Sequence, residues 1–201
     1  MIAVARQSKA ASNITYLIGD ARDVGDNPDW KGKFDKVVSF FVLHWIPFAD
    51  QPRTLKGIVR CLKPGGEGLV IVDKDNEGLE LPTAANLYVK NHEKWGEFVK
   101  GYESPVYMWN QSIPDTVQLL KTFGCSSATC EIKTKELRMS EVQTKLFLRT
   151  SLGEMPLIPA VEHEAFLDDL WQWAVSHYQT KAPERGYICL LIESVVIHFR
   201  K

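Results

Sequence analysis

Apolar residues along this chain form short runs that alternate with amphipathic segments, a pattern that predicts alternating strands and helices. The clearest run covers 35–41 (DKVVSFF) and leads into a loop that carries His44 and Trp45. A nearly continuous apolar run of this length is typical of a parallel strand covered on both faces. Ligands bind at the carboxyl ends of strands in open α/β sheets, so a site is expected between Ser39 and Trp45.

The next segments complete a strand–helix–strand unit. Residues 51–61 place Leu55, Ile58 and Val59 on one helical face. A turn at 64–66 (PGG) then precedes a second apolar strand at 69–72. Two strands joined by a helix in this way form a βαβ unit, so the chain is expected to have an α/β fold.

The rest of the chain continues the alternation. Ser112 is expected to cap the helix that follows it, and the helix over 140–151 is expected to bury Val142, Leu146 and Phe147. The other expected elements are a helix within 1–11, a strand over 14–18, helices over 82–98, 112–123 and 160–178, and strands over 126–139 and 187–199.

Composition narrows the class of protein. A chain of 201 residues is long enough for one domain with a sizeable core. A net charge of -1 and the lack of a basic run give no reason to expect nucleic acid or a membrane surface as partner. Four scattered cysteines and five histidines form no zinc pattern, so no metal site is expected. No signal peptide or apolar run long enough to span a membrane is visible, which favours a cytoplasmic protein with reduced thiols.

Several motifs carry a resemblance to a known family. They are GDA at 19–21, FDxVxSxxxLHW at 34–45, LKPGG at 62–66 and an antiparallel pair of strands at the C-terminus. In this order they resemble the class I S-adenosylmethionine-dependent methyltransferases. LHW, together with FLDD at 166–169, is more narrowly similar to the juvenile hormone acid methyltransferases of arthropods. The resemblance implies an α/β, Rossmann-like class I methyltransferase sheet with helices on both faces.

The chain also departs from the family pattern. The family has seven strands, and the alignment places residue 1 after the second of them. The first strands, the glycine-rich loop and the acidic residue that holds the ribose are therefore expected to be missing. We expect a single, N-terminally truncated domain over 1–201, with a substrate-lid insert at about 76–113 and a helical insert at about 140–180. Such a chain is expected to bind the cofactor weakly or not at all; a partial gene model, a non-catalytic remnant and a homodimer that supplies the missing strands stay open.

The resemblance also implies the residues that bind S-adenosyl-L-methionine. The Asp20 carboxylate would accept a hydrogen bond from the adenine amine, and the Ala21 N–H would meet a ring nitrogen. Backbone groups of Ser39 and Phe40 would face the methionine part. From the residues alone, a solvated turn residue is the favoured explanation for Asp20, and core packing is the alternative for Ser39 and Phe40.

The predicted substrate-binding residues are His44, Trp45, Tyr107 and Trp109. The Trp45 indole N–H can donate to a carboxylate oxygen while its ring forms an apolar wall, and His44 can donate likewise. Tyr107 and Trp109 belong to an aromatic-rich segment that would act as a lid over an apolar acid. Core packing is the alternative for all four residues. No catalytic residue is expected, because a carboxylate with a pKa of ~4 is already ionised at neutral pH.

Two pairs on the expected helix over 160–178 have structural explanations. Asp168 and Asp169 are interpreted as solvated or helix-capping carboxylates. Trp171 and Trp173 cannot both face one core, because residues two apart on a helix diverge.

The expected function is therefore an S-adenosylmethionine-dependent O-methyltransferase that acts on the carboxylate of a small apolar acid of the juvenile hormone acid or farnesoic acid type. One alternative is a methyltransferase of another small acceptor. A second is a catalytically inactive, methyltransferase-like binding module. A nicotinamide-dependent oxidoreductase is less favoured, since the chain has neither the glycine-rich turn nor a Tyr-x-x-x-Lys motif.

Overall fold

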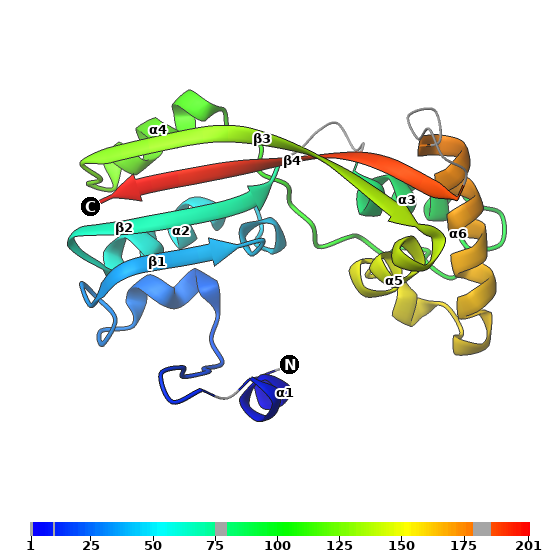
Figure 1. Ribbon diagram of the computed structural model, residues 1–201, viewed down its shortest axis with the longest axis horizontal. Coiled ribbons are helices and arrows are strands. Elements are labelled where there is room, and N and C mark those ends of the chain that lie inside the picture. Colours follow the sequence, from blue (N-terminus) through cyan, green and yellow to red (C-terminus); the bar gives the residue numbers. More distant parts are fainter. Residues whose placement is uncertain (1, 10, 75–79, 179–185) are drawn as a thin grey trace.

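The computed structural model describes residues 2–9, 11–74, 80–178 and 186–201. Within these ranges the chain forms a four-stranded sheet in the order β1-β2-β4-β3 (Figure 1). The strands β1 and β2 are parallel, whereas β4 runs antiparallel to both of its neighbours. The strands are β1 (Phe34–Phe40), β2 (Leu62–Asp73), β3 (Ser127–Ser140) and β4 (Tyr187–Arg200).

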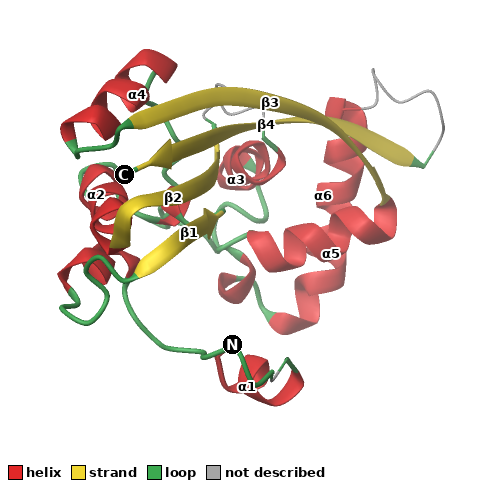
Figure 2. Cartoon of the chain, turned by 60° about the vertical axis from the view of Figure 1, so that its left-hand side comes forward, coloured by secondary structure: helices red, strands yellow, loops and turns green. Residues whose placement is uncertain are grey.

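Helices pack on both faces of the sheet, as the class I methyltransferase fold predicts (Figure 2). The α-helices are α1 (Ile2–Ser8), α2 (Gln51–Cys61), α3 (Leu81–Asn91), α4 (Ile113–Thr122), α5 (Glu141–Ser151) and α6 (His163–Tyr178). Short 3₁₀ turns join them: η1 (Ala21–Asp26), η2 (Leu43–Trp45), η3 (Met155–Leu157) and η4 (Ala160–Glu162).

The long strand β4 contributes to two hydrophobic cores. Val195, Ile197 and Phe199 belong to a core with α2 and α4. Ile188 and Leu190 belong to a second core with α3, α5 and α6. Side chains alternate between the faces of a strand, so odd and even positions of β4 serve opposite faces of the sheet.

The βαβ unit forms as predicted, and α2 occupies the expected residues 51–61. Helix α2 lies very close to η1, because two glycines meet there. A Cβ atom added to Gly25 would lie 2.3 Å from the Gly57 Cα atom. Only glycine, which has no Cβ atom, therefore fits at position 25 without moving the backbone.

The expectation that the first strand of this unit is covered on both faces is wrong. No described strand pairs with the outer edge of β1, and Val38 and Phe40 are 61% and 47% exposed. The strand expected over 14–18 is also not formed. The segment is irregular and exposed, and the Tyr16 carbonyl accepts hydrogen bonds from the Arg6 guanidinium.

The buried face of α5 also differs from the expectation. Val142 and Leu146 are 76% and 61% exposed, while Thr144 and Leu148 are buried. The helix begins at a capping box in which Ser140 and Gln143 exchange hydrogen bonds, directly after β3. This junction sets the rotation of α5 about its own axis. The side of the helix that carries Thr144 and Leu148 therefore faces the core.

In the second core, Asp169 is half-buried and lies inside α6, so it is not a helix cap. Its carboxylate accepts a hydrogen bond of 2.9 Å from the indole N–H of Trp95, which is fully buried. Asp168 forms an ion pair with Lys145. Trp171 is buried in this core, and the half-buried Trp173 packs against the same core and stacks on Tyr88. The expectation that the two tryptophans cannot both face one core is therefore wrong.

Glu154 provides a prediction about stability. Its carboxylate is 1% exposed, and burial raises its pKa above the ordinary 4.5. The ionised form is thus disfavoured in the folded protein, and stability falls as the pH rises from about 4.5 through the raised value. The substitution Glu154→Gln keeps an acceptor for the Asn86 amide. We expect it to raise the unfolding free energy at pH 7.5 by about 1 kcal/mol in urea melts.

The control for this prediction is Glu97→Gln, which changes an exposed carboxylate. It should leave the urea midpoint unchanged at every pH. A loss of stability in Glu154→Gln at pH 7.5 would show that the charged carboxylate stabilises the fold.

Candidate functional site

A cavity of about 520 Å³ opens where β1 and β2 end, which is the volume of a small-molecule site. Its walls are mainly apolar, and its polar groups come from separate elements. The apolar lining consists of Phe41, Trp45, Leu81, Pro82, Val106, Met108, Leu137, Phe147, Leu190, Leu191 and Ile192. The polar lining consists of His44, Asp73, Glu80, Lys135, Ser151 and Ser194.

His44 and Asp73 form a buried polar pair in this cavity. The His44 Nδ1 atom lies 3.5 Å from Asp73 Oδ2, and its side chain is only 7% exposed. Within the described residues Nδ1 makes no hydrogen bond, since the contact with Asp73 is longer than the usual 2.7–3.2 Å. On the other side, Asp73 Oδ1 accepts a hydrogen bond of 3.4 Å from the Ser194 hydroxyl.

Burial controls the charges of this pair. It lowers the pKa of the His44 imidazole, although Asp73 opposes the change. It also raises the pKa of the Asp73 carboxyl, with His44 and the Ser194 hydrogen bond opposing. An imidazole with a lowered pKa is neutral at pH 7, so His44 presents one donor and one acceptor nitrogen.

Gln51 holds η2, the turn that carries His44. Its buried side-chain amide donates to the carbonyls of Leu43 (3.2 Å), Ile46 (3.1 Å) and Tyr107 (2.7 Å). The Tyr107 N–H in turn donates to the His44 carbonyl at 2.7 Å. The turn is thereby tied to the segment that forms the opposite wall.

The residue between β1 and η2 has an unusual backbone. Phe41 has φ of 55°, and it is the non-glycine residue with positive φ among those described. This conformation costs an ordinary residue free energy and is frequent near functional sites. Here it turns the chain from the strand end into the cavity wall, which Phe41 lines.

The two predicted substrate residues of the LHW motif both line the cavity. Trp45 is 49% exposed, and its ring lies 5.4 Å from the His44 ring, centroid to centroid. Nothing in the described part of the chain accepts a hydrogen bond from its indole N–H.

The structure does not bring the other two predicted substrate residues to the cavity. The Trp109 side chain is 1% exposed, and its indole N–H donates to the Thr116 hydroxyl at 3.2 Å. The Tyr107 ring packs edge-on against Phe48. Successive side chains of an extended segment point to opposite sides, so Val106 and Met108 face the cavity in their place.

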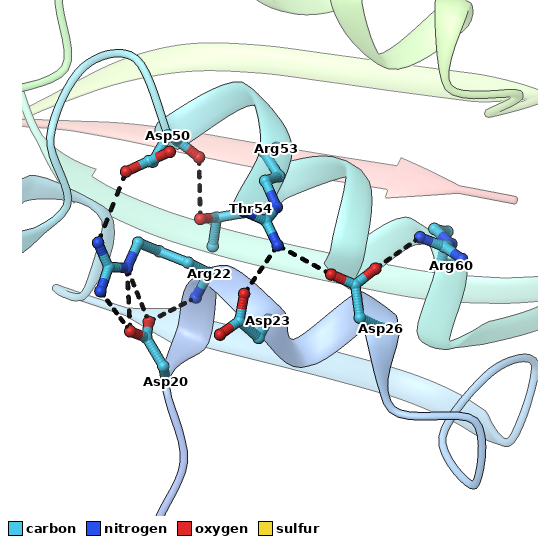
Figure 3. Close-up of polar contacts among 8 residues, drawn as sticks. All are labelled: Asp20, Arg22, Asp23, Asp26, Asp50, Arg53, Thr54 and Arg60. Carbon is cyan, nitrogen blue, oxygen red and sulfur yellow. Dashed lines mark hydrogen bonds and ion pairs between the residues drawn. The ribbon is translucent and has the colours of Figure 1, made fainter.

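The predicted cofactor residues lie outside the cavity lining. Asp20 caps η1, and both of its carboxylate oxygens accept hydrogen bonds from Arg22 (Figure 3). These contacts lower the pKa of Asp20 to about 2. Ala21 is half-buried, as is Ser39, while Phe40 is exposed at the end of β1.

An ion-pair network fixes the turn that carries Asp20 to helix α2. Arg22 also lies 3.7 Å from Asp50, just before the helix. Arg53 of α2 donates to Asp23 and Asp26, and Arg60 contacts Asp26 as well (Figure 3). Helix α2 thus positions the turn that carries Asp20. The first residue of this helix, Gln51, also holds η2.

The sequence interpretation missed Asp73 and Ser194. A signal for Asp73 was present, because it ends the second parallel strand, and strand ends of one sheet edge lie together. Ser194 could not be found without the strand register, which pairs it with Asp73. Among the described residues, no group of three or more His, Cys, Asp or Glu side chains could hold a metal ion. None of the helices in the described ranges is long and apolar enough to span a membrane.

Comparison with solved structures places the fold among the class I methyltransferases. A loganic acid methyltransferase bound to S-adenosylhomocysteine is 13% identical with a TM-score of 0.57, covering 99% of this chain and 70% of that one. The YcgJ protein of Bacillus subtilis is 13% identical with a TM-score of 0.54, covering 99% and 76%. The predicted fold class is therefore confirmed.

Comparison of sequences gives the same class and a narrower relative. Residues 1–70 match the family model described as a methyltransferase domain. The juvenile hormone acid O-methyltransferase of Drosophila melanogaster is 30% identical over 150 residues, which cover 72% of this chain and 48% of the relative. The chain thus spans about half the length of this curated relative. These matches confirm the resemblance seen in the motifs.

Proposed function

We propose that this protein is an S-adenosylmethionine-dependent O-methyltransferase whose acceptor is the carboxylate of a small apolar acid, of the juvenile hormone acid or farnesoic acid type. The observation that carries the proposal is the cavity at the ends of β1 and β2. Its walls are apolar, and its polar end offers the Trp45 N–H and the His44 ring. The matched family and the curated relative support the same chemistry.

The residues of the chain would act by position rather than by proton transfer. A carboxylate is already nucleophilic at neutral pH, so no general base is needed. The apolar walls would hold the chain of the acid and exclude water, while the Trp45 N–H fixes one carboxylate oxygen. Orientation of this kind is worth up to ~7–11 kcal/mol of the barrier.

The turn at Asp20 fits the proposed cofactor, which supplies an activated methyl group when bound. Asp20 is 42% exposed on its side chain, and nothing lies within 4 Å of a Cβ atom placed on the preceding Gly19. The turn is therefore open to a ligand. Asp20, Ala21, Ser39 and Phe40 are the residues proposed to hold it.

Arg22 competes with the cofactor for Asp20 in this proposal. A carboxylate has about four lone-pair directions, and Arg22 already directs its backbone and side-chain donors at both oxygens. In Arg22→Gln the guanidinium is gone. We expect this variant to bind S-adenosylhomocysteine about threefold more tightly in calorimetry, the scale of one exposed ion pair.

The matched control is Arg53→Gln, which removes ion pairs to Asp23 and Asp26 but leaves Asp20 untouched. Its affinity for S-adenosylhomocysteine should equal that of the wild type. Weaker binding by Arg22→Gln would show that Arg22 supports the ligand rather than competes with it.

The cofactor part of the proposal is tested by calorimetry with S-adenosylhomocysteine on the protein produced from its native transcript. Saturable binding with one site is expected, and binding should weaken in Asp20→Asn. Failure of this protein to bind S-adenosylhomocysteine would contradict the enzyme and favour a binding module that only shares the fold.

A further inference from the structure

The polar end of the cavity holds an unsatisfied group. The His44 side chain is more than nine-tenths buried, and its Nδ1 atom has no hydrogen-bond partner in the part of the chain that the structure describes. A buried polar atom without a partner costs free energy, which a ligand or a closer contact would recover. The Asp73 carboxylate lies 3.5 Å from this atom.

The other charged groups of the lining come from two other elements. Glu80 precedes α3, and Lys135 lies on β3. In the strand register, Asp73 of β2 pairs with Ser194 of β4, and Lys135 of β3 pairs with Ile192 of β4. Lys135 is therefore two strands away from Asp73 and displaced by two residues along β4. With strands ~4.8 Å apart, the Lys135 backbone lies roughly 10 Å or more from that of Asp73.

Behind the cavity, Lys74 and Glu193 neighbour Asp73 and Ser194 along their strands and pair with each other at 3.5 Å. Lys74, the cation that follows Asp73 in the sequence, is thus paired with a carboxylate. An anionic head group placed at His44 would meet the Asp73 carboxylate, and the neutral imidazole would not offset the repulsion.

We propose that the His44–Asp73 pair is the head-group subsite of the cavity, and that an apolar acid enters it together with one proton. The proposal rests on the proposed function and names how that acceptor is bound. Asp73 is a positioning residue in it, because it acts on the ligand through His44.

The proton has a defined place. With Nδ1 facing Asp73, the other ring nitrogen of His44 is left for the ligand. A carboxylate there would raise the pKa of the imidazole by ~1–3 units, so that an imidazolium lies between two carboxylates. With the proton on His44, the bound acid stays an ionised carboxylate, which is the nucleophilic form that the proposed function requires.

A dependence of affinity on pH follows. Between the lowered pKa of free His44 and its raised pKa in the complex, the affinity for the acid should fall by about tenfold for each pH unit. An alcohol of the same shape adds no charge to the subsite. Its affinity should change little over the same range.

The test is calorimetric titration of the protein from its native transcript with farnesoic acid at pH 7.5, in phosphate and in Tris. These buffers differ in ionisation enthalpy, so the difference in heat gives the number of protons taken up. About one proton is expected for the wild type. The Asp73→Asn variant should take up close to none, because the second negative charge is gone.

Controls separate the possible outcomes. Asp35→Asn removes an exposed carboxylate paired with Lys63 and should behave as wild type. Farnesol should bind without proton uptake. Because Asp73→Asn could fail to fold, the wild-type affinity is also measured from pH 6.5 to 8.5.

Tight binding of farnesoic acid with no proton uptake and no slope in pH overturns the inference and leaves the proposed function standing. Binding of farnesol but not of farnesoic acid contradicts the acid acceptor itself, and with it the inference.

Discussion

Replacing Gln51 with leucine is expected to lower the unfolding free energy by about 3–5 kcal/mol and to abolish binding of an apolar acid. The Gln51 side chain is 2% exposed, and its amide donates to three carbonyls. Leucine fills similar volume but donates nothing. Each buried carbonyl left without its donor costs about 1–3 kcal/mol, and the Leu43 carbonyl retains a second donor at Ile46.

The loss of acid binding in Gln51→Leu is expected because the three carbonyls belong to the segments that form the walls of the cavity. Two lie in or beside η2, which carries His44, and the third belongs to Tyr107 in the opposite wall. Without the amide, the two walls of the cavity lose their shared anchor. Urea unfolding measures the first effect and calorimetry with farnesoic acid the second.

The matched control is Thr54→Val on the same helix. Thr54 is also buried, but its hydroxyl donates only to the Asp50 carbonyl one turn back. We expect a loss of about 1 kcal/mol and unchanged acid binding. If Gln51→Leu costs no more than this control, the account of η2 is wrong.

The second large effect is expected for Gly25→Ala, at about 3 kcal/mol. The new Cβ atom would lie 2.3 Å from the Gly57 Cα atom, so backbone must move. Overpacking of a tight contact costs typically 1–3 kcal/mol, and contact with backbone rather than a flexible side chain favours the upper end. Thermal and urea unfolding would both show the loss.

The same substitution tests the position of the Asp20 turn. Displacement of η1 from α2 would shift the backbone of the turn that Asp20 caps, and with it the Asp20 carboxylate and the Ala21 N–H. Affinity for S-adenosylhomocysteine should therefore fall at least tenfold. Gly19→Ala is the control, because nothing lies within 4 Å of its Cβ position. Equal behaviour of the two variants would contradict the proposed role of the contact.

The local patterns predicted most elements of the fold because each signal was complete in a few residues. The apolar face of α2 and the Ser112 cap of α4 both appear where the sequence placed them. The long β3–β4 pair also follows its β-branched and apolar content. These elements need no knowledge of distant contacts.

The misses share a different cause. Burial of Val38 depends on whether another strand lies beside β1, and the apolar run itself says nothing about neighbours. The rotation of α5 depends on how β3 ends in Ser140. Tyr107 and Trp109 were predicted to form a lid because of their aromatic side chains. Side chains alternate in direction along an extended segment, so Val106 and Met108 line the cavity instead.

For the site, the LHW motif predicted His44 and Trp45 as substrate-binding residues, and both line the cavity, whereas the partners of His44 could be found only from the fold. The buried pair of His44 with Asp73 joins residues that are far apart in the sequence and meet at the ends of two strands. Arg22 is adjacent to Asp20, yet its hold on the carboxylate becomes visible only from the hydrogen-bond geometry.

Formation of a methyl ester is the most direct test of the proposed function. The protein from its native transcript is incubated with S-adenosylmethionine and farnesoic acid, and methyl farnesoate is sought by mass spectrometry, with farnesol as the competing acceptor. We predict the ester and no methyl ether, and a rate at least tenfold lower in Trp45→Phe, which keeps the ring but lacks the N–H. A protein that binds S-adenosylhomocysteine yet forms no ester from any apolar acid would contradict this account.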